Sequence, residues 1–258
     1  MDFINNKYYI VRIGDFATNA NTKIYCCLFT LMLCMEEYIT FNRTDCFMIL
    51  GISTLIWTLI ELLLHISNTR VIKPMNLYYM NKKKELPNYL GIFLQGFQEG
   101  GCITTFGLYF GDRINNFNYC IFLHILIIVI IINVLTKKNK KIYSSKRQIN
   151  TKSSLFLMGS ITLFNLITLY YNPLHFLRQL SMFFIMTYIC SFWTLIAWYK
   201  EFRKVEIYIK NTLDNNYYIK KDHNIYDTFL VLGYDIIFEI GMAYLFFYNY
   251  YVIYILEN

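Results

Sequence analysis

The chain has few of the residues on which common enzyme sites depend. Its 258 residues include only three prolines and four histidines, and the seven cysteines form neither a CxxC pair nor a Cys/His spacing typical of a metal site. A GxSxG elbow, a phosphate-binding loop and an HExxH motif are all missing. We therefore expect no metal and no cofactor, and we interpret the cysteines as small buried apolar residues.

Charge is also scarce. Charged residues make up 16% of the chain, against 56% hydrophobic and 19% aromatic residues, which is more apolar than an ordinary soluble domain. The net charge of +7 would suit nucleic acid, but the cations alternate with apolar segments and form no continuous basic face. We expect a partner that is mostly lipid bilayer, and no nucleic acid.

Seven apolar segments divide the chain. They cover about 24–40, 46–66, 89–110, 117–136, 154–171, 174–199 and 228–256. As helices they are long enough to cross about 30 Å of hydrocarbon, and the stretch 121–135 has no polar face that a soluble protein would expose. The sequence predicts an all-α polytopic transmembrane bundle of seven helices, forming one domain over 24–256 after an N-terminal tail of residues 1–23.

The basic residues predict the orientation of this bundle. All but three of the 24 Lys and Arg residues fall in the tail and in the loops 67–88, 137–153 and 200–224; the exceptions are Arg43, Arg113 and Arg178. The positive-inside bias then places the N-terminus in the cytosol and the C-terminus outside or in a lumen. We expect the basic loops to contact anionic headgroups as a secondary effect.

One basic loop and one sequon leave alternatives open. Apolar residues recur at helical spacing in 200–224 (Phe202, Val205, Ile209, Leu213), which is compatible with an interfacial helix, and a solvated linker fits equally well. Asn42 begins an N-glycosylation sequon on the predicted outer side. The bias toward Lys, Asn, Ile and Tyr is typical of an AT-rich genome, such as a viral or parasite one. The endoplasmic reticulum, plasma and viral membranes are all plausible locations, and the oligomeric state is not indicated.

Polar residues at membrane depth are the main functional clue. A charged group there costs roughly 2.5–3.5 kcal/mol on insertion scales, so it requires a partner or a function. When the direction of each crossing is applied, the acids of three helices and one histidine fall between the midplane and the cytosolic face, and a glutamine lies close to the middle of the third segment. The candidate residues are Glu61, His65, Gln95, Glu99, Asp235 and Glu239.

Several kinds of chemistry fit these residues. Carboxylates one turn apart in a low dielectric disfavour each other's ionised form, as in proton carriers, and the same oxygens can coordinate a cation. The leading hypothesis is therefore proton or cation transport through a buried acidic cluster. One alternative is a membrane enzyme that acts on lipid, with Glu61 and His65 as acid and base. Another is a non-catalytic scaffold or host-interaction protein, in which protonated acids bond to His65, Gln95 and Gln98.

Two further patterns concern packing. Gly96 to Gly100 and Gly107 to Gly111 have the GxxxG spacing that allows close helix contact in lipid. Glu36, Glu37 and Arg178 lie near the predicted outer interface, where an ion pair between the first and sixth segments, or placement without pairing, is equally compatible with the sequence.

Seven helices invite comparison with rhodopsins and G-protein-coupled receptors. None of the seven segments contains a lysine, so retinal has no attachment point, and the cytosolic N-terminus opposes the receptor topology. The predicted inverted topology and the length resemble those of heliorhodopsins, although no motif matches. The resemblance implies a lysine-less, pigment-free bundle.

Overall fold

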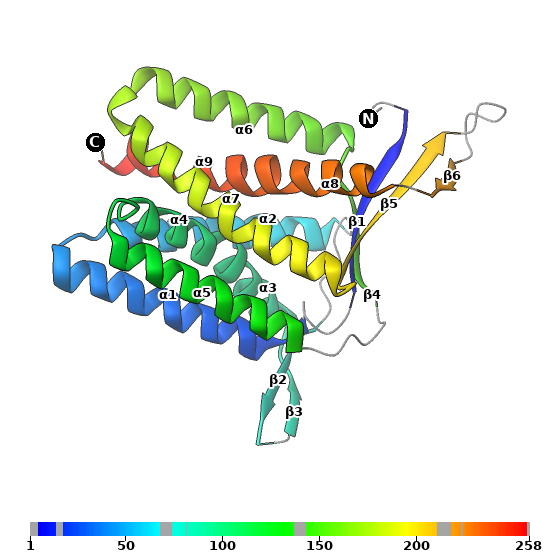
Figure 1. The fold of residues 1–258 in the computed structure, drawn as a ribbon, viewed down its shortest axis with the longest axis horizontal. Coiled ribbons are helices and arrows are strands. Elements are labelled where there is room, and N and C mark those ends of the chain that lie inside the picture. The colour runs from blue at the N-terminus through cyan, green and yellow to red at the C-terminus, as the bar shows by residue number, and fades with distance from the viewer. Residues whose placement is uncertain are drawn as a thin grey trace.

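The computed structural model describes residues 5–13, 18–67, 74–80, 82–136, 143–210, 218–222 and 224–256. The described chain is mostly helical, and every predicted apolar segment coincides with a helix (Figure 1). Five of these are regular α-helices: α1 (Ala20–Phe41), α2 (Asp45–Ile66), α5 (Phe117–Thr136), α6 (Lys152–Tyr171) and α7 (Phe176–Tyr199). A short 3-10 turn, η3 (Pro173–His175), precedes α7.

The third and seventh helices are composite, because a π-helical segment interrupts each one. The third consists of α3 (Asn88–Gly96), η2 (Phe97–Cys102) and α4 (Ile103–Gly111). The seventh consists of α8 (Ile225–Tyr234), η4 (Asp235–Met242), α9 (Ala243–Tyr251) and η5 (Val252–Leu256). The π-segments η2 and η4 contain the predicted acids of both helices.

Six helices of the described residues are long and apolar enough to cross a membrane. They are Ala20–Phe41, Asp45–Ile66, Phe117–Thr136, Lys152–Tyr171, Pro173–Tyr199 and Ile225–Ile255. Large apolar side chains on their outer faces are exposed, for example Ile128 and Ile132 on α5 and Phe156 on α6. Such faces are stable only in hydrocarbon. The chain is therefore a multi-pass membrane protein that contacts the lipid bilayer.

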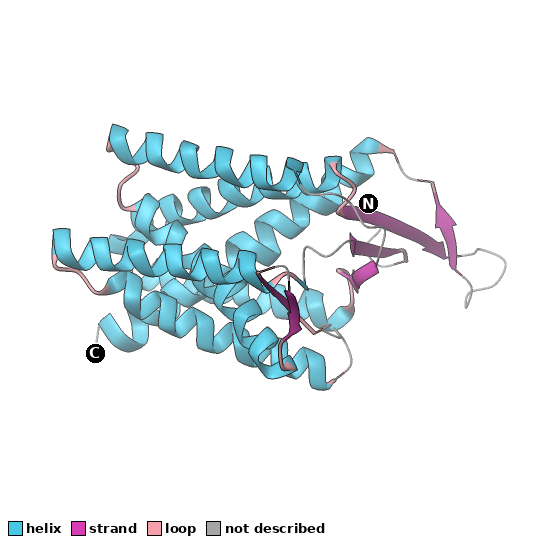
Figure 2. Cartoon of the chain, turned by 90° about the horizontal axis from the view of Figure 1, so that it is seen from below, coloured by secondary structure: helices cyan, strands magenta, loops and turns pink. Residues whose placement is uncertain are grey.

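A four-stranded antiparallel sheet covers one end of the bundle, so the chain is mostly helical but not all-α (Figures 1 and 2). Its strands are β1 (Lys7–Ile13), β4 (Tyr143–Gln148), β5 (Arg203–Lys210) and β6 (Tyr218–Lys221), in the order β4-β1-β5-β6. We call this end of the bundle the sheet end, and the opposite end the far end. The strands come from the N-terminal tail and two of the basic loops.

The described part of the loop 200–224 therefore forms neither the interfacial helix nor the solvated linker that its sequence allowed. Its described part forms β5 and β6, in which Ile207 lies opposite Lys221. Val205 is buried against the bundle in β5, whereas Leu213 lies outside the described residues. Val205 and Ile207 are two residues apart and lie on one face of the strand. The apolar residues here therefore follow the period of a strand and not the helical period that their wider spacing suggested.

One face of the sheet packs on the helices. Tyr8 and Ile10 of β1 are buried in a cluster with Val205, Val231 and Leu232, which joins β1 and β5 to α8. Because side chains on one strand face are two residues apart, Arg12 continues the row of Tyr8 and Ile10 toward the bundle. Burial of this apolar row fixes which residues of the sheet reach the helices.

Glycines bring the composite third helix close to two neighbours, as their spacing predicted. A Cβ on Gly96 would lie 2.8 Å from the backbone of Thr58 in α2, and one on Gly100 would lie 2.7 Å from the Ser53 carbonyl oxygen. Gly107 similarly meets Met186 of α7. The first GxxxG pair thus serves the contact with α2, and the second serves the contact with α7.

Candidate functional site

The predicted acids lie together at the sheet end of the bundle. Glu61 of α2 is fully buried, and Asp235 and Glu239 of η4 are buried one turn apart. Glu99 of η2 has a side chain that is 17% exposed. We call these four residues the acid cluster.

Arginines from three strands enter the acid cluster. Arg12 of β1 donates to Glu99, with 2.9 Å between Nη1 and Oε1. Arg147 of β4 is ion-paired with both Asp235 and Glu239, its Nη2 lying 3.2 Å from Oδ1 of Asp235.

Arg203 of β5 completes the set of strand arginines in the described residues. It is ion-paired with Asp235 and donates from Nη1 to the hydroxyl of Thr194 in α7 at 3.0 Å. The sheet and the helices are therefore joined by charge pairs, and the pair of Arg203 with Asp235, which is buried on both sides, is of the kind that costs several kcal/mol to break from one side.

The pKa values of the arginines reflect this placement. Burial acts to lower the pKa of Arg12, but the charges of Glu99, Asp235 and Glu61 outweigh it, so the pKa lies above its ordinary value. For Arg203, burial dominates over the attraction of Asp235 and lowers the pKa. A guanidinium in a protein stays protonated in either case. Glu61 is thus close enough for its charge to act on Arg12.

The π-helical segments help to position the acids. A π-turn accommodates an extra residue within a helix and shifts the direction of the side chains that follow it, and such turns are frequent at functional sites. Glu99 lies within η2, and Asp235 and Glu239 lie within η4. The pattern of apolar residues in the sequence did not distinguish these π-helical segments from regular α-helix.

The remaining predicted residues have other surroundings. Gln95 and Gln98 each accept a hydrogen bond at 2.7 Å from the ammonium group of Lys23. Lys23 is buried in the first turn of α1, whereas the sequence had placed it in the tail. His65 is half-buried in the last turn of α2, one turn beyond Glu61 toward the sheet end.

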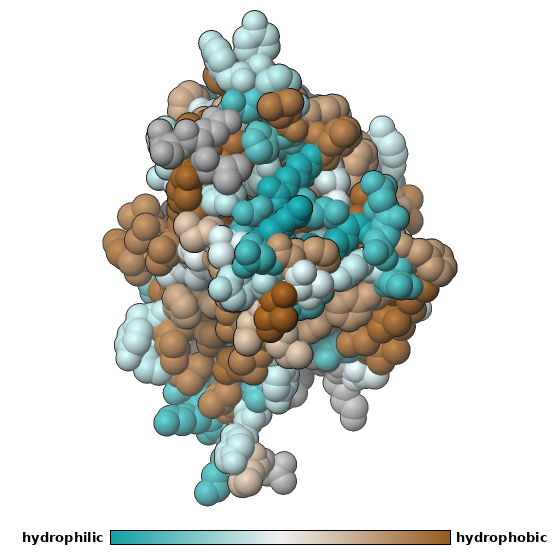
Figure 3. Space-filling model, turned by 90° about the vertical axis from the view of Figure 1, so that its left-hand side faces the viewer, coloured by the Kyte–Doolittle hydropathy of each residue, from teal (hydrophilic) through white to brown (hydrophobic). Residues whose placement is uncertain are grey.

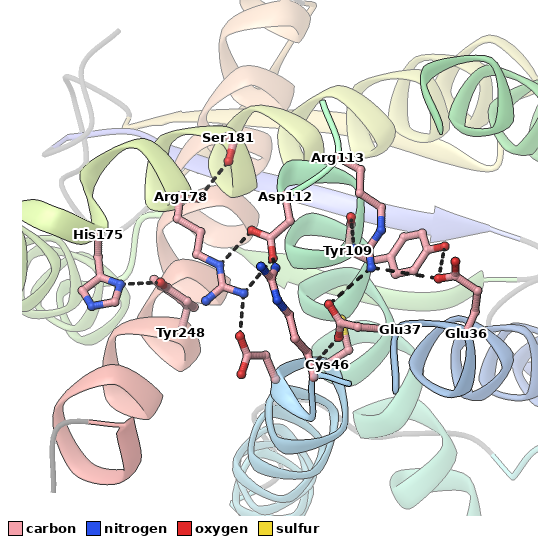
Figure 4. Close-up of polar contacts among 12 residues, drawn as sticks. Glu36, Glu37, Cys46, Tyr109, Asp112, Arg113, His175, Arg178, Ser181 and Tyr248 are labelled. Atoms are coloured by element: carbon pink, nitrogen blue, oxygen red, sulfur yellow. Dashed lines mark hydrogen bonds and ion pairs between the residues drawn. The ribbon is translucent and has the colours of Figure 1, made fainter. Parts of the chain in front are cut away.

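A second charged cluster lies at the far end, where hydrophilic residues gather within a largely hydrophobic surround (Figure 3). Arg178 binds Asp112 through two nitrogens, at 2.8 and 2.7 Å, and Asp45 at 2.6 Å (Figure 4). The Tyr251 hydroxyl donates to Asp45 at 2.9 Å. We call Arg178, Asp112, Asp45 and Tyr251 the far-end cluster.

The suggestion that Arg178 forms an ion pair with Glu36 or Glu37 is wrong. Arg113 takes those partners instead, with Nη2 3.5 Å from Glu37 and 3.9 Å from Glu36. The hydroxyl of Tyr109 also donates to Glu36, at 2.7 Å. The packing of α4 on α7 brings Asp112 to Arg178. An arginine that binds both oxygens of one carboxylate forms a stronger ion pair than one that makes a single contact.

Two other candidate features can be located. Asn42 is exposed and ends α1 in a left-handed conformation with φ of 52°, in the short turn before α2. The seven cysteines are free, and five of them are buried. Within the described residues no group of three or more His, Cys, Asp and Glu side chains is arranged to hold a metal ion.

Amides connect three helices beside the far-end cluster. Gln179 of α7 donates to Asn249 of α9, and Asn249 donates to Asn165 of α6, both at 2.8 Å. Asn165 in turn donates to the Met242 carbonyl oxygen at 2.9 Å. Such interhelical hydrogen bonds stabilise helix packing where no water is present.

No family model, curated protein or solved structure matches the chain. The function therefore has to be inferred from the geometry of the acid cluster and its surroundings.

Proposed function

We propose that the protein transfers protons across the membrane, and that the acid cluster takes up and releases them on the cytosolic side. The observation that carries this proposal is that four carboxyl groups from three helices lie at the same end of the bundle, three of them buried and Glu99 half-buried, beside strands from the N-terminal tail and the basic loops. Ionisable groups inside a bilayer are costly and are characteristic of proton relays. A carboxyl group among neighbouring acids and arginines can change its protonation state with a small change in their distance.

Protons are favoured over metal cations by the positions of the arginines. Guanidinium groups of Arg12, Arg147 and Arg203 occupy carboxylate oxygens that a cation would need as ligands. They also repel a second positive charge, with an energy that grows as the local dielectric falls. A proton needs only one oxygen of one carboxyl group, so it can be accepted without displacing all three arginines.

Polar atoms continue from the acid cluster toward the far end. The hydroxyl oxygens of Thr58 and Thr54 and the indole nitrogen of Trp57 are buried on α2 without a hydrogen-bond partner in the described residues, as is the hydroxyl of Thr105 on α4. Unsatisfied polar atoms in hydrocarbon cost several kcal/mol each, unless water reaches them. Because the glycines of the third helix pack closely against Thr58, Trp57 and Thr54, these atoms mark a line of polar positions at a tight helix contact, along which a proton would have to pass between side chains.

Proton flux into liposomes tests the proposal. Purified protein would be reconstituted with a pH-sensitive dye inside the vesicles, beside Glu61→Gln and Glu99→Gln, which keep the side-chain size but remove the exchangeable charge. Asp227→Asn is the matched control, since Asp227 is an acid in the first turn of α8 outside the cluster. We expect flux in the unaltered protein and the control, and its loss in both glutamine variants, with circular dichroism showing that each variant is folded.

Absence of flux in folded, unaltered protein would overturn the proton-transfer proposal. Conversion of added lipid by the same protein would instead support an enzyme that uses Glu61 and His65. If neither occurs, the scaffold alternative gains weight, because the pairs of Arg147 and Arg203 with Asp235 also fit a purely structural joint between the sheet and the helices.

A further inference from the structure

A β-hairpin separate from the main sheet projects from the sheet end of the bundle. It consists of β2 (Asn76–Tyr79) and β3 (Lys82–Glu85), with Tyr79 opposite Lys82 and Leu77 opposite Lys84. In Figure 1 it points away from the body at right angles to the helices, in Figure 2 it points toward the viewer, and neither view shows another element covering it.

The hairpin is firmly attached at its base. The side chain of Asn21, in the first turn of α1, donates to the Tyr78 carbonyl oxygen and accepts from the Tyr78 amide, both at 2.8 Å. Met75, directly before β2, is fully buried against Ala20 and Leu94. The base of the hairpin is therefore held by the ends of α1 and α3.

This attachment sets the depth of the hairpin relative to the membrane. Asn21 lies in the first turn of the membrane-spanning helix α1, and α3 begins at Asn88, only three residues after β3 ends. Residues at the ends of spanning helices lie at the level of the lipid headgroups. A hairpin that leaves this level at right angles to the helices runs along the membrane surface.

The exposed side chains of the hairpin are those that favour an anionic lipid surface. Tyr79 is 68% exposed and Met80 is 78% exposed, next to three consecutive exposed lysines, Lys82, Lys83 and Lys84. Tyrosine and methionine can enter the region between headgroups and acyl chains, and lysine clusters beside a spanning helix attract anionic headgroups. Cross-strand pairing places an aromatic residue beside a lysine on both faces, Tyr79 with Lys82 and Tyr78 with Lys83.

We propose that the β2–β3 hairpin is a membrane-surface anchor that binds anionic phospholipids. Its tyrosine and methionine side chains enter the interface beside α1, and its three lysines bind the headgroups around them. The anchor does not depend on proton transfer, so either proposal can fail without the other.

Tryptophan fluorescence tests the anchor in the full-length protein. Tyr79→Trp would be placed in nanodiscs of phosphatidylcholine, with or without phosphatidylserine, and the signal of Trp57, Trp193 and Trp198 in the unaltered protein would be subtracted. We expect a blue shift of the added emission, and quenching by brominated lipid, that both increase when phosphatidylserine is present.

Two further variants in the Tyr79→Trp background distinguish lipid binding by the hairpin lysines from a general effect of positive charge at the sheet end. Replacing all three hairpin lysines by glutamine should abolish the increase caused by phosphatidylserine. Replacing three other lysines at the sheet end, Lys200, Lys204 and Lys221, by glutamine is the matched control and should leave it unchanged. A solvent-exposed emission in both membranes, or quenching that is equal with and without phosphatidylserine, would overturn the proposal.

Discussion

Arg12 and Arg203 lie directly opposite each other on β1 and β5, and both point toward the membrane helices. Like charges at opposed positions destabilise an antiparallel pair of strands. The pair is stable here because Arg12 binds Glu99 and Arg203 binds Asp235, so each charge has its own carboxylate partner. The register of the sheet and the acids of the helices therefore depend on each other.

Asp235→Asn should strongly destabilise the protein. Asp235 is ion-paired with both Arg147 and Arg203, and its replacement leaves buried guanidinium charge without its counter-ion. Breaking a buried pair from one side costs about 3–5 kcal/mol. Thermal unfolding in detergent would measure the loss, and Asp227→Asn, outside the cluster on the same composite helix, should have little effect.

Gly100→Ala should weaken the contact between α2 and the third helix. A Cβ at Gly100 would lie 2.5 Å from the Trp57 Cβ and 2.7 Å from the Ser53 carbonyl oxygen, so the helices must move apart. Overpacking of this kind costs about 1–3 kcal/mol. Gly159→Ala on α6 has nothing within 4 Å and is the control; equal melting temperatures for the two variants would contradict the expectation.

Arg178→Lys should destabilise the far end even though the charge is kept. Arg178 binds both oxygens of Asp112 and also Asp45, and an ammonium group cannot reproduce this planar arrangement. We expect a loss of about 1–3 kcal/mol, comparable to a charged hydrogen bond. Arg43→Lys is the control, since Arg43 is more exposed and 3.8 Å from Asp112.

The outer face of the sheet should lose stability in acid. Burial acts to raise the pKa of Glu206, but hydrogen bonds from Lys146, Lys220 and Tyr208 outweigh it and lower the pKa from its ordinary 4.5 to about 2. A carboxylate with a lowered pKa in the folded state stabilises the fold above its unfolded pKa, and this contribution is lost as the pH falls from about 4.5 to about 2.

Glu206→Gln isolates this contribution. At pH 7 we expect the variant to be less stable than the unaltered protein by about 1 kcal/mol or less, because solvent screens a pair at the surface. The difference should shrink progressively below pH 4.5, because Glu206 of the unfolded chain becomes protonated there while Glu206 of the folded protein is still ionised. A difference in unfolding temperature that stays constant between pH 7 and pH 3 would contradict the assignment.

The helices could be predicted from the sequence because lipid imposes a simple constraint. A span must satisfy its backbone internally and present apolar side chains, so the apolar runs mark α5 and α6 to within two residues. The beginning of α1 was less accurate, because Lys23 interrupts the apolar run. Its helical position depends on Gln95 and Gln98, which are distant in sequence and accept hydrogen bonds from its ammonium group.

That the acids lie near one end of the bundle could be predicted from the sequence, but their arginine partners could not. The arginine partners belong to the same basic tail and loops that indicate the topology; they are Arg12, Arg147 and Arg203. A count of charges does not distinguish a solvated lysine from an arginine whose side chain enters the bundle. The alternation of Tyr8, Ile10 and Arg12 is typical of a strand and was the available signal. Pairing of β1 with β4 and β5 joins residues more than a hundred positions apart, which a single sequence does not reveal.

The central position of β1 imposes an order on assembly. Among the described elements this strand precedes every helix, yet its two neighbours, β4 and β5, follow α5 and α7. The amide of Tyr8 binds the side chain of Asn150, 142 residues later in the chain. The chain must therefore be synthesised beyond β5 before β1 can pair on both of its edges, and until then no complete sheet holds Arg12 against Glu99.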